Sequence, residues 1–214
     1  YEKLSVGYSG QLRNSILTKE KDLLQSNLVR DWKNGMRHSV PISLTVPLLD
    51  YINLTLGVNY NEWWYTKGIR KSWNEDKKTF LPSDTTYKFR RLYDYSLSAG
   101  LSTTLYGMFK PWKPFSFGGN LIMIRHRFTP TVSFSYMPDF TKRRYGFWEL
   151  LEHTDQNGKL HTLRYSPYSE QIFGAPSMGN AGSVNFSFDN NLEAKIKSKS
   201  DSTGIKKISL IDQF

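Results

Sequence analysis

Residues 91–106 alternate between apolar and small polar side chains, and this run constrains the fold more than any other part of the chain. Tyr, Leu and Ala occupy most of the odd positions, whereas Asp, Ser, Gly and Thr occupy the even ones from 94 to 104. Successive residues of a β-strand face opposite sides, so a period of two predicts a strand with one apolar and one polar face. The run is as long as a tilted strand that crosses a bilayer, which needs about 9–11 residues. We therefore predict a transmembrane strand whose small polar side chains face a hydrated lumen.

The same alternation recurs along the chain, at residues 3–12, 38–47, 52–60, 123–136, 182–197 and 205–214. This repetition predicts an all-β fold: an antiparallel transmembrane β-barrel segment, with about eight strands of a larger outer-membrane barrel. Because the pattern is already under way at Tyr1 and no Met precedes it, we expect the chain to be an internal piece of a longer protein.

The composition fits a barrel. Hydrophobic residues make up 38% of the chain, below the roughly 45–50% that is typical of globular proteins. Aromatic residues nevertheless reach 15%, which argues against disorder. In a barrel only alternate residues meet lipid, and aromatic rings gather at the two membrane interfaces. No apolar run is long enough for a transmembrane helix, which needs about 18 residues or more.

The connections between the predicted strands differ in length. We expect residues 1–214 to form part of one outer-membrane β-barrel domain, with extracellular loops near 66–89 and 137–181 and periplasmic turns near 47–51, 107–122 and 198–204. Outer-membrane barrels have short periplasmic turns and longer extracellular loops. A soluble β-sandwich does not predict this asymmetry.

Four local features are predicted from turn signals and irregular patterns. Asn34-Gly35 lies between extended runs and predicts a tight hairpin on the extracellular side. Residues 13–24 suggest a turn, with a strand resuming near Leu24. Residues 66–89 are charged and predict an irregular loop. Residues 148–165 predict a small hairpin that turns at Asp155–Gly158.

The alternation also assigns individual side chains. The candidates for a lumen-facing position are Ser96, Ser98, Ser102, Thr131, Ser133, Ser135, Asn185 and Asn191. Trp63, Trp64 and Tyr65 end a predicted strand and are the candidates for an interface girdle, with a soluble aromatic core as the alternative. Pro41 cannot donate to a central ladder, so we expect a bulge or weakened pairing there.

The net charge of +10 raises the question of an anionic partner. Most of the cations lie between the predicted strands, so we expect anionic lipid headgroups or an anionic cargo and no nucleic acid. Solvated loop charges are the alternative. Arg125-His126-Arg127 lies at a strand start, where we expect snorkelling anchors at the membrane rim.

No motif for catalysis or metal binding is present. The chain has no Cys, which excludes disulfides and Cys-based metal sites. Its four His lack metal-site spacing, and neither a nucleophile elbow nor a phosphate-binding P-loop occurs. Residues 155–158 resemble the start of a calcium loop but lack its spacing and closing Glu. We predict no catalytic residue, no cofactor and no metal site.

Several runs together resemble the LptD family, the outer-membrane lipopolysaccharide-assembly barrel, in its Bacteroidetes form. The matching runs span most of the chain in the family's order: Asn34–Ser43, Tyr60–Lys67, Leu105–Phe109, Ile124–Phe140, Tyr165–Tyr168 and Phe186–Glu193. The resemblance implies a portion of a very large barrel of about 26 strands. The periplasmic β-jellyroll of the family has no counterpart here, and no functional residue of the family is carried over.

The resemblance implies that the protein is located in the cell outer membrane and passes lipopolysaccharide through the barrel to the outer leaflet. The implied partners are lipopolysaccharide, a plug lipoprotein of the LptE type, a periplasmic lipopolysaccharide bridge and outer-membrane lipid. Two alternatives remain open at this point. One is another large outer-membrane barrel, either a protein-secretion translocon or a nutrient transporter. The other is a soluble carbohydrate-binding β-sandwich, whose apolar faces would pack against one another. An enzyme is not expected.

Overall fold

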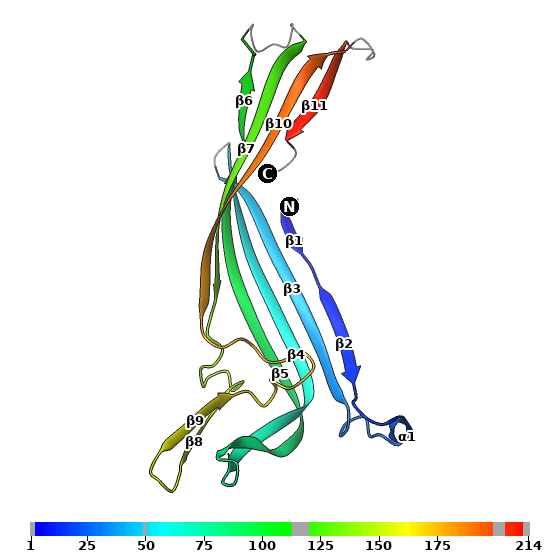
Figure 1. The fold of residues 1–214 in the computed structure, drawn as a ribbon, viewed down its shortest axis with the longest axis vertical. Helices are drawn as coiled ribbons and strands as arrows, with labels where there is room; N and C mark the ends of the chain where they lie inside the picture. Colours follow the sequence, from blue (N-terminus) through cyan, green and yellow to red (C-terminus); the bar gives the residue numbers. More distant parts are fainter. Residues whose placement is uncertain (1–2, 49–50, 113–119, 199–203, 212–214) are drawn as a thin grey trace.

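A computed structural model describes residues 3–48, 51–112, 120–198 and 204–211. Most of these residues belong to one curved antiparallel sheet (Figure 1). Its strands are β1 (Leu4–Val6), β2 (Ser9–Ser15), β3 (Lys33–Leu48), β4 (Ile52–Asn74), β5 (Thr79–Thr103), β6 (Leu105–Phe109), β7 (Leu121–Met137), β10 (Ala181–Lys197) and β11 (Ile205–Ile211). The predicted all-β, antiparallel class is confirmed.

The sheet is open at both sides in the part of the chain that is described. Its strand order is β1-β3-β4-β5-β7-β10-β11, with β2 next to β1 along β3 and β6 next to β5 along β7. A separate two-stranded sheet consists of β8 (Glu149–Thr154) and β9 (Leu160–Tyr165). One short helix, α1 (Glu20–Leu23), lies between β2 and β3. The described strands therefore form a wall and not a closed barrel.

The two ends of the sheet differ in what they carry (Figure 1). At the end that we call the loop end lie α1, the tip of the β4–β5 hairpin and residues 138–180, which include β8 and β9. At the other end, the turn end, β3 leads into β4 and β10 leads into β11. Residues 49–50, 113–119 and 199–203 of the three predicted turns lie outside the described residues. Part of the predicted 107–122 connection is strand, because β6 continues the pairing of β5 along β7.

The strand register gives the sheet an apolar face and a polar face. One row of directly paired residues crosses five strands as Leu44, Leu56, Ala99, Phe134 and Val184. The neighbouring row, one residue along each strand, is Ser43, Gly57, Ser98, Ser135 and Ser183. Because a shift by one residue would exchange the faces, this alignment keeps the alternation of each strand in phase with the next.

The apolar face has no second sheet packed against it among the described residues. Leu44 is 36% exposed, Leu101 47% and Phe186 65%, although all three lie within long strands that are paired on both sides. A soluble sandwich would bury such side chains between two sheets. The exposed apolar rows are therefore inconsistent with that alternative for the described part of the chain.

The predicted hairpin at Asn34-Gly35 is wrong, because both residues lie inside β3. The connection between β2 and β3 covers residues 16–32 and contains α1, where a strand near Leu24 was expected. The side chain of Asn34 donates a hydrogen bond to the carbonyl of Leu28 and so holds this connection. Gly35 is buried and lies against residues 172–173 and Tyr65.

The prediction of an irregular loop at residues 66–89 is also wrong, because these residues form the end of the β4–β5 hairpin. β4 and β5 remain paired as far as Asn74 and Thr79, so only residues 75–78 turn. The register shifts between Tyr65 and Lys67 and again between Arg70 and Lys71. Such shifts increase the local twist of the strands. This part of β4 and β5 lies beyond the apolar rows of the sheet. Neither of its two faces therefore has to be apolar, and charged residues can occupy both.

The small hairpin predicted within residues 148–165 is confirmed as β8 and β9. Its turn is fixed by Asp155, whose side-chain Oδ1 accepts hydrogen bonds from the backbone N–H groups of Asn157 and Lys159, both at 2.9 Å. Gly158 has a φ of +78°, which favours glycine at that position.

The buried core lies at the loop end. Its buried members are Trp63, Tyr65, Leu92, Phe140, Phe147 and Tyr168. β7 pairs with β5 only from Leu97 to Ser102, so the first part of β5 has no strand partner on that side. Residues 140–147 pack there, with the ring of Phe140 5.4 Å from that of Tyr95. Long loops thus cover the strand edge that β7 leaves open.

Candidate transport surface

The polar face is lined by hydroxyl, amide and glycine residues over five strands. A second row of paired residues runs Thr45, Thr55, Gly100, Ser133 and Asn185. Several of these side chains hydrogen-bond across strands: Ser135 Oγ lies 2.8 Å from Ser183 Oγ, and Thr45 Oγ1 lies 3.2 Å from Thr55 Oγ1. The small side chains leave the face flat, and each hydroxyl can exchange its partner for water or for a sugar hydroxyl.

The register brings all the lumen-facing candidates to this one face. Ser96, Ser98 and Ser102 alternate along β5, and the latter two pair with Ser135 and Thr131. Asn185 pairs with Ser133, and Asn191 pairs with Arg127. Arg127 lies an even number of residues from Ser133 on β7, so both pairs are on the same face. Whether this face borders a lumen stays a prediction. The structure adds that a Cβ at Gly57 would collide with the hydroxyl of Ser98, so the face is closely fitted there.

A segment that we call the cap, residues 165–176, begins at the last residue of β9 and covers the polar face at the loop end. Tyr65 Oη donates to the carbonyl of Gly174 at 2.8 Å, and the backbone N–H of Ile69 donates to the carbonyl of Pro167 at 2.8 Å. Lys33 Nζ donates to the carbonyl of Glu170 at 2.8 Å. Burial raises the pKa of Tyr168, whose ring stacks on that of Tyr65 at a centroid distance of 5.9 Å. The cap is therefore fastened to β3 and β4.

The three girdle candidates do not share one face. Trp63 is 6% exposed and Tyr65 1%, and both belong to the buried core. Only Trp64 lies on the apolar face, where its ring centroid is 4.3 Å from that of His38. Consecutive residues of a strand face opposite sides, so Trp64 points away from the other two, and the interface girdle stays a prediction. Phe89 is a second neighbour of Trp64, with the two ring centroids 5.8 Å apart, and no local sequence pattern indicates that Trp64 would contact either His38 or Phe89.

Pro41 lies opposite the break between β1 and β2. Its pairing with Asn59 of β4 continues without a register shift, so no bulge occurs on that side. On the other side β1 ends at Val6 and β2 begins at Ser9, with one hydrogen bond of 2.8 Å from Gly7 N to the carbonyl of Pro41. Proline has no N–H to donate, which accounts for an interruption at this place. Weakened pairing around Pro41 remains a prediction.

Arg125 and Arg127 are not rim anchors on the apolar face. They pair with Glu193 and Asn191 and lie on the polar face, whereas His126 lies between them on the other side, with Nε2 3.1 Å from Asn190 Oδ1. Arg125 Nη2 makes an ion pair of 2.7 Å with Glu193 Oε2. The sequence does contain a signal for this shared face: the two arginines are two residues apart, and such residues lie on one face of a strand.

No group of side chains that could hold a metal ion occurs among the described residues. The loop-end histidines have acidic partners: His153 Nε2 lies 3.1 Å from Glu75 Oε1, and His161 Nε2 lies 3.0 Å from Asp155 Oδ2. The hydrogen bond with His161 and the one from the backbone N–H of Lys159 hold the pKa of Asp155 below its ordinary value. The first contact joins the β8–β9 hairpin to the tip of the β4–β5 hairpin, and the second lies within the β8–β9 hairpin. In the described chain no helix has the length and apolar character that crossing a membrane requires.

Comparison with known proteins gives one family. A family model described as LptD protein matches residues 1–214. No curated protein and no solved structure matches the chain.

Proposed function

The chain belongs to the LptD protein family, and from this premise we propose that it forms part of the wall of an outer-membrane β-barrel that passes lipopolysaccharide to the outer leaflet. Membership of this family supports a role in lipopolysaccharide transport and assembly. Our proposal adds the route of the cargo, the orientation of the sheet and the role of each face.

The observation that carries the proposal is the pair of faces built from the same strands. Burying an exposed Leu, Val or Phe side chain is worth about 1.5–3 kcal/mol. The apolar rows are therefore stabilised by contact with lipid acyl chains, and the polar rows by contact with water. Lipopolysaccharide has the same division, with acyl chains at one end and a phosphorylated sugar headgroup at the other. The polar face can pass the headgroup while the acyl chains remain near lipid.

We assign the loop end to the cell exterior and the turn end to the periplasm. Long connections lie at the loop end, as in outer-membrane barrels. The cap would then cover the outer end of the polar face, and cargo would reach this face from the turn end. A periplasmic lipopolysaccharide bridge would deliver the cargo there, and a plug lipoprotein of the LptE type would lie against the polar face.

The protein supplies a path and no catalysis in this proposal. The polar rows hold hydroxyl and amide groups that bind a sugar headgroup weakly and release it again. The free energy for transport would have to come from the delivering partner. Outer-membrane lipid would solvate the apolar face throughout.

Site-specific photocrosslinking in cells tests the proposal. The probe replaces Ser98, Ser133 or Asn191 on the polar face, with Leu97, Val132 and Leu192 on the apolar face as matched controls. We expect lipopolysaccharide or lipoprotein adducts from the polar set only. Equal adducts from both sets, or none from either set in a protein that is recovered in the soluble fraction, would contradict it.

A further inference from the structure

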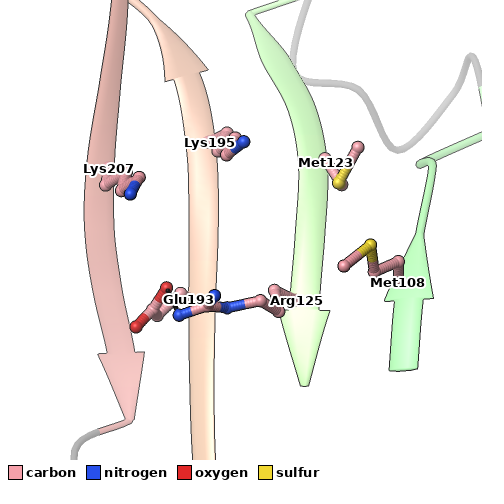
Figure 2. A pocket seen from close by; sticks show the side chains of 6 residues that line it. All are labelled: Met108, Met123, Arg125, Glu193, Lys195 and Lys207. Atoms are coloured by element: carbon pink, nitrogen blue, oxygen red, sulfur yellow. Dashed lines mark ion pairs between the residues drawn. The ribbon is translucent and has the colours of Figure 1, made fainter. Parts of the chain in front are cut away.

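A small cavity lies on the polar face near the turn end, where four strands meet (Figure 2). Its volume is about 180 Å³, and its lining residues are Met108, Met123, Arg125, Glu193, Lys195 and Lys207. They come from β6, β7, β10 and β11. The register orders them in two rows: Met108, Arg125 and Glu193 pair in sequence, as do Met123, Lys195 and Lys207. The cavity is therefore formed by residues far apart in the chain.

The cavity has an excess of positive charge. Three cations and one carboxylate line it, which gives a net charge of +2. Glu193 is engaged with Arg125, whose side chain reaches toward it across β10 (Figure 2). Arg has five N–H donors in all, so this ion pair leaves others free to bind a ligand.

The two lysines form a like-charge pair. Lys195 and Lys207 are direct cross-strand partners, an arrangement that destabilises a sheet. Neither has an ion-pair partner among the described residues. An anion held between their ammonium groups would remove this repulsion.

The two methionines indicate that the ligand also has an apolar part. Met108 and Met123 lie side by side next to the cations (Figure 2), on the face whose rows through Ser98 and Ser133 carry small polar side chains. Methionine side chains are flexible and adapt to apolar groups of different shape. The cavity is smaller than the roughly 300–1,000 Å³ typical of sites for drug-sized ligands. It therefore fits one anionic group, while the rest of the ligand extends along the open face.

We propose that Arg125, Lys195 and Lys207 bind the phosphate ester of an anionic amphiphile, with Met108 and Met123 contacting its apolar part. A phosphate monoester carries a charge of about −1.5 to −2 at neutral pH, which matches the net charge of the cavity. The assignment of this amphiphile as incoming cargo rests on the proposed function, since it requires the turn end to face the periplasm. A phosphorylated glycolipid carries such a monoester, and a membrane phospholipid carries a phosphodiester with a single negative charge, so both place a phosphate group next to acyl chains.

The test measures equilibrium binding to the full-length protein purified in detergent. The probes are lipopolysaccharide, dephosphorylated lipopolysaccharide, phosphatidylglycerol and inorganic phosphate. The test variant combines Lys195→Gln with Lys207→Gln, and a second variant replaces both by Arg. The matched control is Lys206→Gln, because Lys206 is the neighbour of Lys207 on β11 but pairs with Ile196 and so lies on the opposite face.

We expect the double Gln variant to bind lipopolysaccharide at least about tenfold more weakly, since each charge-assisted hydrogen bond contributes to the affinity. The double Arg variant and the Lys206 variant should stay within about twofold of the unmodified protein. Dephosphorylated lipopolysaccharide should bind the unmodified protein as weakly as lipopolysaccharide binds the double Gln variant. Competition by phosphatidylglycerol would assign the site to membrane lipid, and its absence to the cargo; both outcomes support a phosphorylated amphiphile.

Two outcomes would overturn the site. One is competition by inorganic phosphate as effective as that by lipopolysaccharide, which would exclude a role for the apolar part. The other is equal affinity of the double Gln variant and the Lys206 control. The proposed function fails separately, through the absence of adducts at Ser98 and Ser133, and such a failure leaves phosphate-dependent binding at this cavity measurable.

Discussion

At the scale of single residues, contacts that are distant in sequence decide several positions. Gly35 lies within β3 although Asn-Gly is a strong local turn signal, because the cap packs directly over it. A Cβ built at Gly35 would lie 2.6 Å from Ile172 Cγ2 and 3.0 Å from the ring of Tyr65. The glycine is therefore explained by close packing and not by a turn.

Replacing Gly35 by Val should loosen the cap. Forcing extra carbon atoms into a filled site typically costs about 1–3 kcal/mol. We expect faster hydrogen exchange of residues 165–176 in the Gly35→Val variant, with exchange of β10 unchanged. Gly100→Ala is the matched control, because a Cβ there makes an ordinary contact of 3.7 Å with Ser133. Equal exchange of the cap in both variants would refute the packing argument.

The residue scale also shows what could be predicted from sequence. The lumen-facing candidates fall on one face because a period of two depends only on neighbouring residues in a strand. The burial of Trp63 and Tyr65 could not be predicted in this way, since it depends on a loop about a hundred residues away, as the Tyr65–Gly174 bond shows. Likewise, the pairing of Lys195 with Lys207 depends on the β10–β11 register, and alternation alone does not fix it.

At the scale of elements, local hydrogen-bonding capacity explains where strands are interrupted. β1 and β2 keep the same register along β3 but are separated opposite Pro41. β4 and β5, in contrast, stay paired well past the apolar rows, as far as Asn74 and Thr79, although this part of both strands is rich in charged residues. Their sequence instead predicts a charged loop, since apolar alternation is lost there.

Replacing Pro41 by Val should strengthen the β1–β2 side of β3. The new N–H can donate to the ladder, and Val favours strands. We expect slower hydrogen exchange in residues 4–15 of the Pro41→Val variant. Pro47→Val serves as the control, because Pro47 lies beyond the part of β3 that pairs with β1. Unchanged protection around Pro41 would end the weakened-pairing hypothesis.

At the scale of the whole molecule, the sheet has two surfaces that require different surroundings. The rows through Leu44 and Phe134 are exposed on one side, and the rows through Ser98 and Ser133 lie on the other. In the described chain, residues 140–147 contact this apolar side through Tyr93 and Tyr95 at the loop end, whereas the rows nearer the turn end stay exposed. This arrangement is what a barrel wall between lipid and water requires.

Charge insertion should therefore have opposite effects at two adjacent positions. Phe134→Arg places a charge on the apolar face, which costs about 2–4 kcal/mol near the bilayer midplane. Ser133→Arg places the same side chain on the polar face. We expect Phe134→Arg to lower the fraction of folded protein in the outer membrane and Ser133→Arg to leave it nearly unchanged, measured by protease protection in membrane fractions. Equal losses would show that the faces are not solvated differently.

The attachment of the cap has a consequence for the order of folding. The bond between Lys33 and Glu170 spans 137 residues, and that between Tyr65 and Gly174 spans 109. Contacts of such long range form late, because the entropy of closing a large loop must be offset before they stabilise anything. The cap can dock only after β3 and β4 are paired. Protection of residues 165–176 from hydrogen exchange would therefore appear only once this part of the sheet is complete. The time at which it appears during refolding would report when β3 and β4 have paired.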